Sequence, residues 1–90
     1  MENNKLETIK SFLKERYYDI EAETQDSIRF SNFGSIIEVY PDETVRYYID
    51  MEGDNIINSK DEIEDLMTMF DELEFDAEEL AEEFGLSIVY

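Results

Sequence analysis

The sequence contains no cysteine and no histidine, and each absence removes a class of chemistry. Without cysteine the chain can form no disulfide, no thiolate nucleophile and no zinc–thiolate site. Without histidine it lacks the usual general base near neutral pH and the commonest transition-metal ligand. Only three glycines are present, and none belongs to a glycine-rich phosphate loop. We therefore predict a protein that is not an enzyme, with no catalytic residues, no metal site and no cofactor.

Long apolar runs are also missing. No run approaches the roughly 18 residues that cross a membrane, and the N-terminus MENNKLETIK has no apolar signal-peptide core. We therefore expect a soluble, cytoplasmic protein without a membrane partner, located in the host cell cytoplasm if a phage encodes it.

Positive charge is scarce. Seven Lys and Arg residues stand against 25 Asp and Glu, which gives a formal net charge of −18 at pH 7. Nucleic acid and anionic membranes would repel such a chain, so neither is expected as a direct partner. The charge far exceeds the roughly 2–8 that keeps a small domain soluble. Because self-repulsion destabilises a compact state, we expect the excess to serve a function.

The apolar pattern predicts one α+β domain over residues 1–90. Leu6, Ile9, Leu13 and Tyr17 recur at helical spacing near the N-terminus. Four strand-like segments joined by short connections follow, which favours an antiparallel meander. In the first, alternation places Tyr18, Ile20 and Ala22 on one face and Asp19, Glu21 and Glu23 on the other. The four segments are residues 18–24, 27–31, 35–40 and 45–51.

The C-terminal third predicts two acidic helices. Ser59 and Glu62 form a capping-box pattern at the start of a helix that reaches about Leu73. In an unbroken helix Phe75 would point outward among acidic side chains. We therefore predict a break there, with Asp76 capping a second helix at residues 77–84. Gly85 is placed to terminate that helix, and residues 86–90 can form a short last strand.

Two short motifs resemble known binding elements without completing them. The run EELAEEFGLS, residues 78–87, resembles the first helix and turn of DNA-binding helix-turn-helix domains. That family requires a recognition helix next, and only three residues follow. A calcium-loop pattern begins at Asp50, but its sixth position is Asn55 instead of glycine and its twelfth is Asp61 instead of glutamate. We interpret it as an ordinary loop, and weak calcium binding there stays open.

The acidic run near the C-terminus is the main candidate site. Twelve Asp and Glu residues lie between Asp61 and Glu83, and no basic residue follows Lys60. At about 1.5 Å rise per helical residue this gives one charge per roughly 3 Å, close to the 3.4 Å of a single nucleic-acid strand. Asp19, Glu21 and Glu23 form a secondary candidate. The primary partner-binding residues are Asp61, Glu64, Asp65, Asp71, Glu72, Glu74, Asp76, Glu78, Glu79, Glu82 and Glu83.

In size, acidity and expected α+β fold, the chain resembles phage-encoded inhibitors of bacterial defence, such as anti-CRISPR and anti-restriction proteins. The resemblance implies a nucleic-acid mimic that occupies the cationic groove of a DNA- or RNA-binding protein. The alternative is an immunity-type protein that neutralises a basic toxin enzyme, for which tyrosine anchors would matter more. A solvated acidic surface on a structural or regulatory module is the third interpretation.

Overall fold

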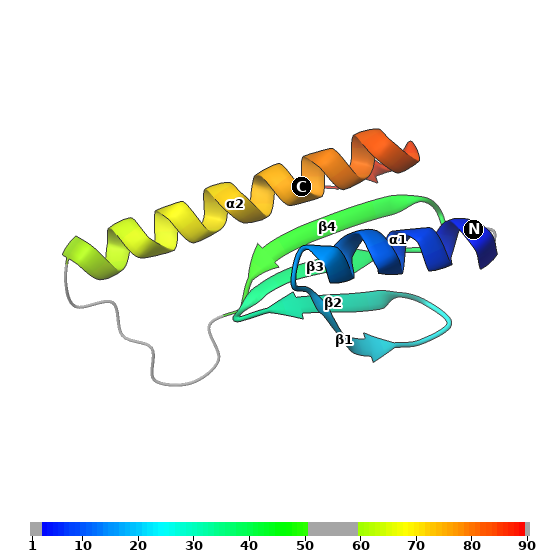
Figure 1. Cartoon of the computed structure of the whole chain (residues 1–90), viewed down its shortest axis with the longest axis horizontal. Helices are drawn as coiled ribbons and strands as arrows, with labels where there is room; N and C mark the ends of the chain where they lie inside the picture. Colours follow the sequence, from blue (N-terminus) through cyan, green and yellow to red (C-terminus); the bar gives the residue numbers. More distant parts are fainter. Residues whose placement is uncertain (1–2, 51–59, 90) are drawn as a thin grey trace.

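The computed structural model describes residues 3–50 and 60–89, without the side chains of residues 3 and 60–64. One five-stranded sheet has the spatial order β1-β2-β3-β4-β5. The first four strands form an antiparallel meander, and β5 pairs parallel to β4. The elements are α1 (Asn3–Glu15), β1 (Asp19–Glu23), β2 (Ile28–Asn32), β3 (Ser35–Val39), β4 (Thr44–Ile49), α2 (Lys60–Phe84) and β5 (Ser87–Ile88). The predicted α+β class, N-terminal helix and four-stranded meander are confirmed (Figure 1).

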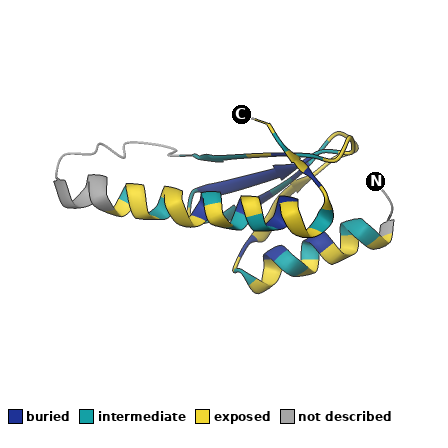
Figure 2. Ribbon diagram, turned by 90° about the horizontal axis from the view of Figure 1, so that it is seen from above, coloured by how far each residue is buried: buried dark blue, intermediate teal, exposed yellow. Residues whose placement is uncertain are grey.

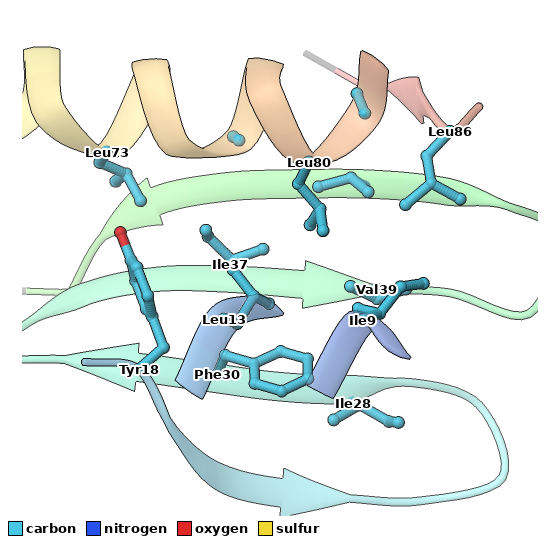
Figure 3. Packing of buried hydrophobic residues seen from close by; sticks show 13 residues of the cluster. Ile9, Leu13, Tyr18, Ile28, Phe30, Ile37, Val39, Leu73, Leu80 and Leu86 are labelled. Atoms are coloured by element: carbon cyan, nitrogen blue, oxygen red, sulfur yellow. The ribbon is translucent and has the colours of Figure 1, made fainter. Parts of the chain in front are cut away.

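The core lies between the sheet and the two helices, which pack on the same face of the sheet (Figure 2). Side chains three or four residues apart share one face of α1 and α2, and every second side chain of a strand shares one face of the sheet. The apolar faces of the helices pack against the apolar face of the sheet. Each fully buried side chain of this kind contributes about 1.5–3 kcal/mol relative to an exposed one. The best-buried members are Ile9, Leu13, Phe30, Ile37, Val45, Leu73 and Leu80, most of which are labelled in Figure 3.

The prediction of two C-terminal helices is wrong, because α2 runs unbroken for 25 residues from Lys60 to Phe84. Leu73 and Ala77, which flank the expected break, are four residues apart and both buried on the same stripe. No proline or glycine interrupts the segment, so nothing opposes the helical ladder. Phe75 consequently points outward and is 64% exposed. Asp76 lies inside the helix and does not cap a second one.

The predicted alternation of β1 fails at a β-bulge. Ile20 pairs with Phe30, but the next pairing joins Ala22 to Arg29, so Glu21 is the extra residue. A bulge shifts the side chains after it to the opposite face. Glu23 therefore lies on the helix side of the sheet, where its carboxylate accepts a hydrogen bond from Lys10 Nζ at 2.9 Å. All five residues of β1 are exposed.

Tyr17 was predicted on the apolar stripe of the first helix, and the structure corrects this. The helix ends at Glu15, and Tyr17 adopts a left-handed backbone with φ of 70°. Its amide donates to Lys14 O at 3.0 Å and the Tyr18 amide donates to Leu13 O at 3.0 Å, which is the Schellman pattern. The turn leaves Tyr17 82% exposed and buries Tyr18 in its place.

Gly85 terminates α2 as predicted. Its φ is 66°, and the Leu86 amide donates to Ala81 O at 2.8 Å. The chain then enters β5, whose register pairs Ser87 with Thr44. A strand therefore follows the EELAEEFGLS motif where a helix-turn-helix domain would place its recognition helix. The capping box at Ser59 and most of the calcium-loop pattern lie outside the described residues.

Candidate functional site

The acidic side chains of α2 cover the part of the helix that faces away from the sheet. The side chains of Asp61 and Glu64 are outside the described set. Glu74, Asp76 and Glu79 are partly buried at the flanks of the helix. The exposed ones are Asp65, Asp71, Glu72, Glu78, Glu82 and Glu83. The helix itself is about 37 Å long, so these charges form an extended surface.

Arg16 is the cation that contacts this surface from within the described chain. Its Nη2 lies 2.8 Å from Glu79 Oε1, and its Nε lies 3.6 Å from Asp76 Oδ1. Its guanidinium also stacks 3.8 Å from the centre of the Phe12 ring. None of the six exposed carboxylates of α2 has an ion pair among the described residues. Those six therefore keep their charge available to a partner.

Asp76 is the α2 carboxylate most involved in holding the fold. It accepts a 3.0 Å hydrogen bond from the Tyr18 hydroxyl in addition to its contact with Arg16. Burial raises the pKa of Asp76, and the hydrogen bond from Tyr18 and the charge of Arg16 offset only part of that rise. Burial and the neighbouring Asp76 charge also raise the pKa of Tyr18. Asp76 thus connects α2 to the end of α1.

The secondary acidic group is separate from α2. Strand β1 is at the edge of the sheet opposite β5, whereas α2 packs over β3, β4 and β5. Asp19 and Glu21 are exposed there without an ion pair in the described part of the chain, while Glu23 is bound to Lys10. The fold therefore does not merge the two predicted acidic groups into one surface.

An aromatic hollow, missed by the sequence reasoning, lies where the end of α1, strand β2 and the middle of α2 meet. It has a volume of about 510 Å³, and Tyr17 and Phe75 are its exposed aromatic members. Four carboxylates surround these rings. If α2 is taken as one continuous helix, helical periodicity places Phe75 on its exposed face. No sequence pattern indicates the left-handed turn that exposes Tyr17. The complete lining is Glu15, Arg16, Tyr17, Asn32, Asp71, Glu72, Phe75 and Asp76.

A second polar cluster, also missed, lies on the sheet face away from the helices. The hydroxyls of Tyr40 and Tyr48 both donate to the buried Glu38 carboxylate, and Arg29 Nη2 lies 3.6 Å from it. Burial raises the pKa of Glu38, but these hydrogen bonds and the charges of Arg29 and Arg46 outweigh it and hold that pKa below its usual value. The pKa of Tyr48 rises to about 12, mainly by burial. The pKa of Glu38 is lowered and that of Tyr48 is raised, so both move further from neutral pH. The cluster is therefore suited to stabilising the sheet and not to proton transfer.

The described residues contain neither a metal-binding cluster nor a membrane-spanning helix. No three acidic side chains there are arranged to hold a metal ion. No helix in the same part of the chain is both long and apolar enough to cross a bilayer. No protein-family model, curated protein sequence or solved structure matches the chain. The residues of the chain itself are therefore the basis for inferring its function.

Proposed function

We propose that this chain is an acidic inhibitor that imitates a nucleic-acid strand. Helix α2 would occupy the cationic groove of a DNA- or RNA-binding protein, for example a CRISPR effector or a restriction enzyme, and block access of the substrate. The observation that supports this most is the unbroken α2, with exposed carboxylates that the described cations of the chain leave unpaired.

The spacing of the charges fits this function. From Asp65 to Glu83 there are nine carboxylates over about 27 Å of helix axis, or one per about 3 Å, and six of them are exposed and unpaired within the described residues. A single nucleic-acid strand carries one charge per about 3.4 Å. Because α2 is one continuous helix, the charges follow a single axis instead of the two angled helices expected from the sequence.

Helical geometry divides these carboxylates into two rows. Asp65 and Glu72 are seven residues apart, which is nearly two full turns, and therefore lie on one side of Phe75. Asp71 and Glu78 are likewise seven apart and lie on its other side. Successive members of each row are about 10.5 Å apart along the axis. Arginine and lysine side chains of a phosphate-binding groove could pair with both rows, giving fast and salt-sensitive association.

The alternative function is neutralisation of a basic toxin enzyme by an immunity-type protein. The exposed Tyr17 and Phe75 favour it, because aromatic anchors carry much of the binding energy in protein–protein interfaces. Other tyrosines are committed elsewhere: Tyr18 is buried, and Tyr40 and Tyr48 are bound to Glu38. In this case the acidic helix would recognise one enzyme surface without imitating a polymer.

Competition distinguishes the two functions. The chain is used to capture a target from bacterial lysate, the target is identified by mass spectrometry and purified, and the complex is titrated with duplex DNA and with RNA. A mimic loses its target to one of these polymers, and its affinity falls steeply between 50 and 300 mM salt. An immunity-type protein bound away from a nucleic-acid site keeps its target. A flat salt dependence would exclude the electrostatic mechanism for both.

A matched pair of variants tests the role of α2. In the first, Glu78→Gln and Glu82→Gln remove two exposed, unpaired charges from the helix. In the control, Asp19→Asn and Glu21→Gln remove two exposed, unpaired charges from β1. We expect the α2 variant to lose about tenfold in affinity and the β1 variant to lose less than twofold. Equal losses would show that only the total charge matters, against a specific role of α2.

A further inference from the structure

Two exposed aromatic residues occupy backbone conformations that favour glycine or asparagine. Tyr17 has a φ of 70°, and Phe33 has a φ of 48° in the two-residue turn between β2 and β3. Bulky side chains are disfavoured in this region, and such hairpin turns prefer Asn-Gly over Phe-Gly. Tyr17 is 82% exposed and Phe33 97% exposed, so packing does not compensate. The fold thus retains aromatic side chains where they lower its stability.

The other helix end provides the comparison. Both α1 and α2 are followed by a residue with a left-handed backbone. In each case the amide of the next residue donates a hydrogen bond to the carbonyl five residues before it. At α2 that residue is Gly85, as the geometry prefers, whereas at α1 it is Tyr17. Strain that the fold does not need points to a role for the side chain itself.

The residues around Tyr17 indicate what its side chain could bind. Tyr17 and Phe75 both line the aromatic hollow, which Glu15, Asp71 and Glu72 also line. Those three carboxylates are exposed and have no ion pair within the described residues. Asn32, the residue before Phe33, also lines the hollow. Exposed rings with unpaired carboxylates beside them form an environment for a flat organic cation.

The chain itself contains an example of this recognition. The Arg16 guanidinium stacks on Phe12 and pairs with Glu79 of α2. An arginine entering the hollow would find the same two elements, an aromatic face and an α2 carboxylate. Arginine suits this environment better than lysine, because its planar guanidinium stacks on rings and forms paired hydrogen bonds with a carboxylate.

We propose that the aromatic hollow binds an arginine side chain of the partner protein, stacked against Tyr17 and Phe75 and paired with Asp71 or Glu72. This inference rests on the proposed function, because it supplies the specific anchor beside the long electrostatic surface of α2. The partner would therefore present an arginine at the edge of its cationic groove, positioned for the middle of the helix.

The test uses two peptides of equal charge, hexa-arginine and hexalysine, at low ionic strength. Binding is measured by calorimetry, and aromatic NMR resonances report ring contacts. We expect hexa-arginine to bind about threefold more tightly than hexalysine and to shift the Tyr17 and Phe75 ring signals. Equal affinities, or unshifted rings with hexa-arginine, would overturn the proposal.

Variants locate the preference. Phe75→Ala and Tyr17→Gly should each abolish the preference for arginine, and Tyr17→Gly should melt at or above the temperature of the native chain, because glycine fits the turn. Met67→Ala is the control, since Met67 is 62% exposed on the same helix but does not line the hollow. It should keep the preference. Loss of the preference in Met67→Ala, or its survival in Phe75→Ala, contradicts the proposal.

The two proposals fail separately. Suppose that the double variant Glu78→Gln and Glu82→Gln lowers the affinity for the captured target while Phe75→Ala does not. The acidic surface then acts without the hollow, and the proposed arginine anchor is wrong. If the peptides show the arginine preference but DNA and RNA never displace the target, the hollow is a cation site and nucleic-acid mimicry is wrong.

Discussion

At the scale of single residues, Glu38 is the centre of a hydrogen-bonded group on the sheet face away from the helices. Its side chain is on the central strand β3, where both faces are buried. The two tyrosine hydroxyls and Arg29 satisfy its carboxylate, and the Arg46 guanidinium lies 5.6 Å from the centre of the Tyr48 ring. Removing one member of a buried hydrogen-bonded group leaves the others unsatisfied, which costs more than the net value of each bond.

We therefore expect Glu38→Gln to lower the free energy of unfolding at pH 7 by about 1–3 kcal/mol. Since the pKa of Glu38 is below its ordinary 4.5 in the folded chain, the ionised side chain contributes its stability above that value. The contribution is lost as pH falls through the folded-state pKa, so the variant and the native chain should converge in acid. Urea unfolding from pH 7 to pH 3 measures this difference. A difference that stays constant across that range would contradict it.

At the scale of elements, the end of α2 determines how the chain returns to the sheet. Gly85 takes the left-handed position, and the backbone amides of Ser87 and Val89 then bind Glu43 O and Val45 O at 2.9 and 2.8 Å. These bonds connect the last residues to β4 and its preceding turn. The orientation of the acidic helix on the sheet therefore depends partly on one backbone conformation.

Gly85→Ala should destabilise the chain by about 1 kcal/mol and lower its melting temperature by roughly 4–8 °C. A Cβ at this position would have no heavy atom within 4 Å, so the cost arises from the backbone and not from a clash. Gly85→Asn is the control and should lose less, because asparagine tolerates this conformation. Thermal unfolding followed by circular dichroism measures both. Equal losses in the two variants would argue against a backbone origin.

The elements that the sequence predicted correctly are those that local pattern specifies. Helical spacing in α1, short connections in the meander and Gly85 at the end of α2 each act within a few residues. The errors arose where tertiary packing decides. The stripe from Leu73 to Ala77 keeps α2 continuous although Phe75 is then exposed, and the bulge at Glu21 redirects Glu23 toward Lys10. The aromatic hollow could not be predicted, because its residues come from elements whose contact depends on the whole fold.

At the scale of the whole molecule, charge is unevenly distributed. Three cations of the N-terminal segment act as internal counterions: Lys5 pairs with Glu43 in the turn before β4, Lys10 with Glu23 of β1, and Arg16 with Glu79 of α2. These partly exposed pairs contribute little individually. Beyond Lys60 the sequence offers no further cation. Most of the net charge of −18 therefore remains as self-repulsion, which screening by salt relieves.

The melting temperature should consequently rise by several degrees between 20 and 500 mM NaCl at pH 7.

The melting temperature should also rise on modest acidification, because the pKa of Asp76 is raised in the folded chain. Ionisation of such a group opposes folding above its folded-state pKa, and that cost disappears as the pH falls toward the unfolded-state value. Glu38 and Glu43 act oppositely, since their pKa values are lowered, but their stabilisation is lost only below about pH 4.5. Melts at pH 7, 6 and 5 in NaCl and in tetramethylammonium chloride separate screening from specific ion binding. A melting temperature that falls with both salts would show that self-repulsion is not what limits the stability of the fold.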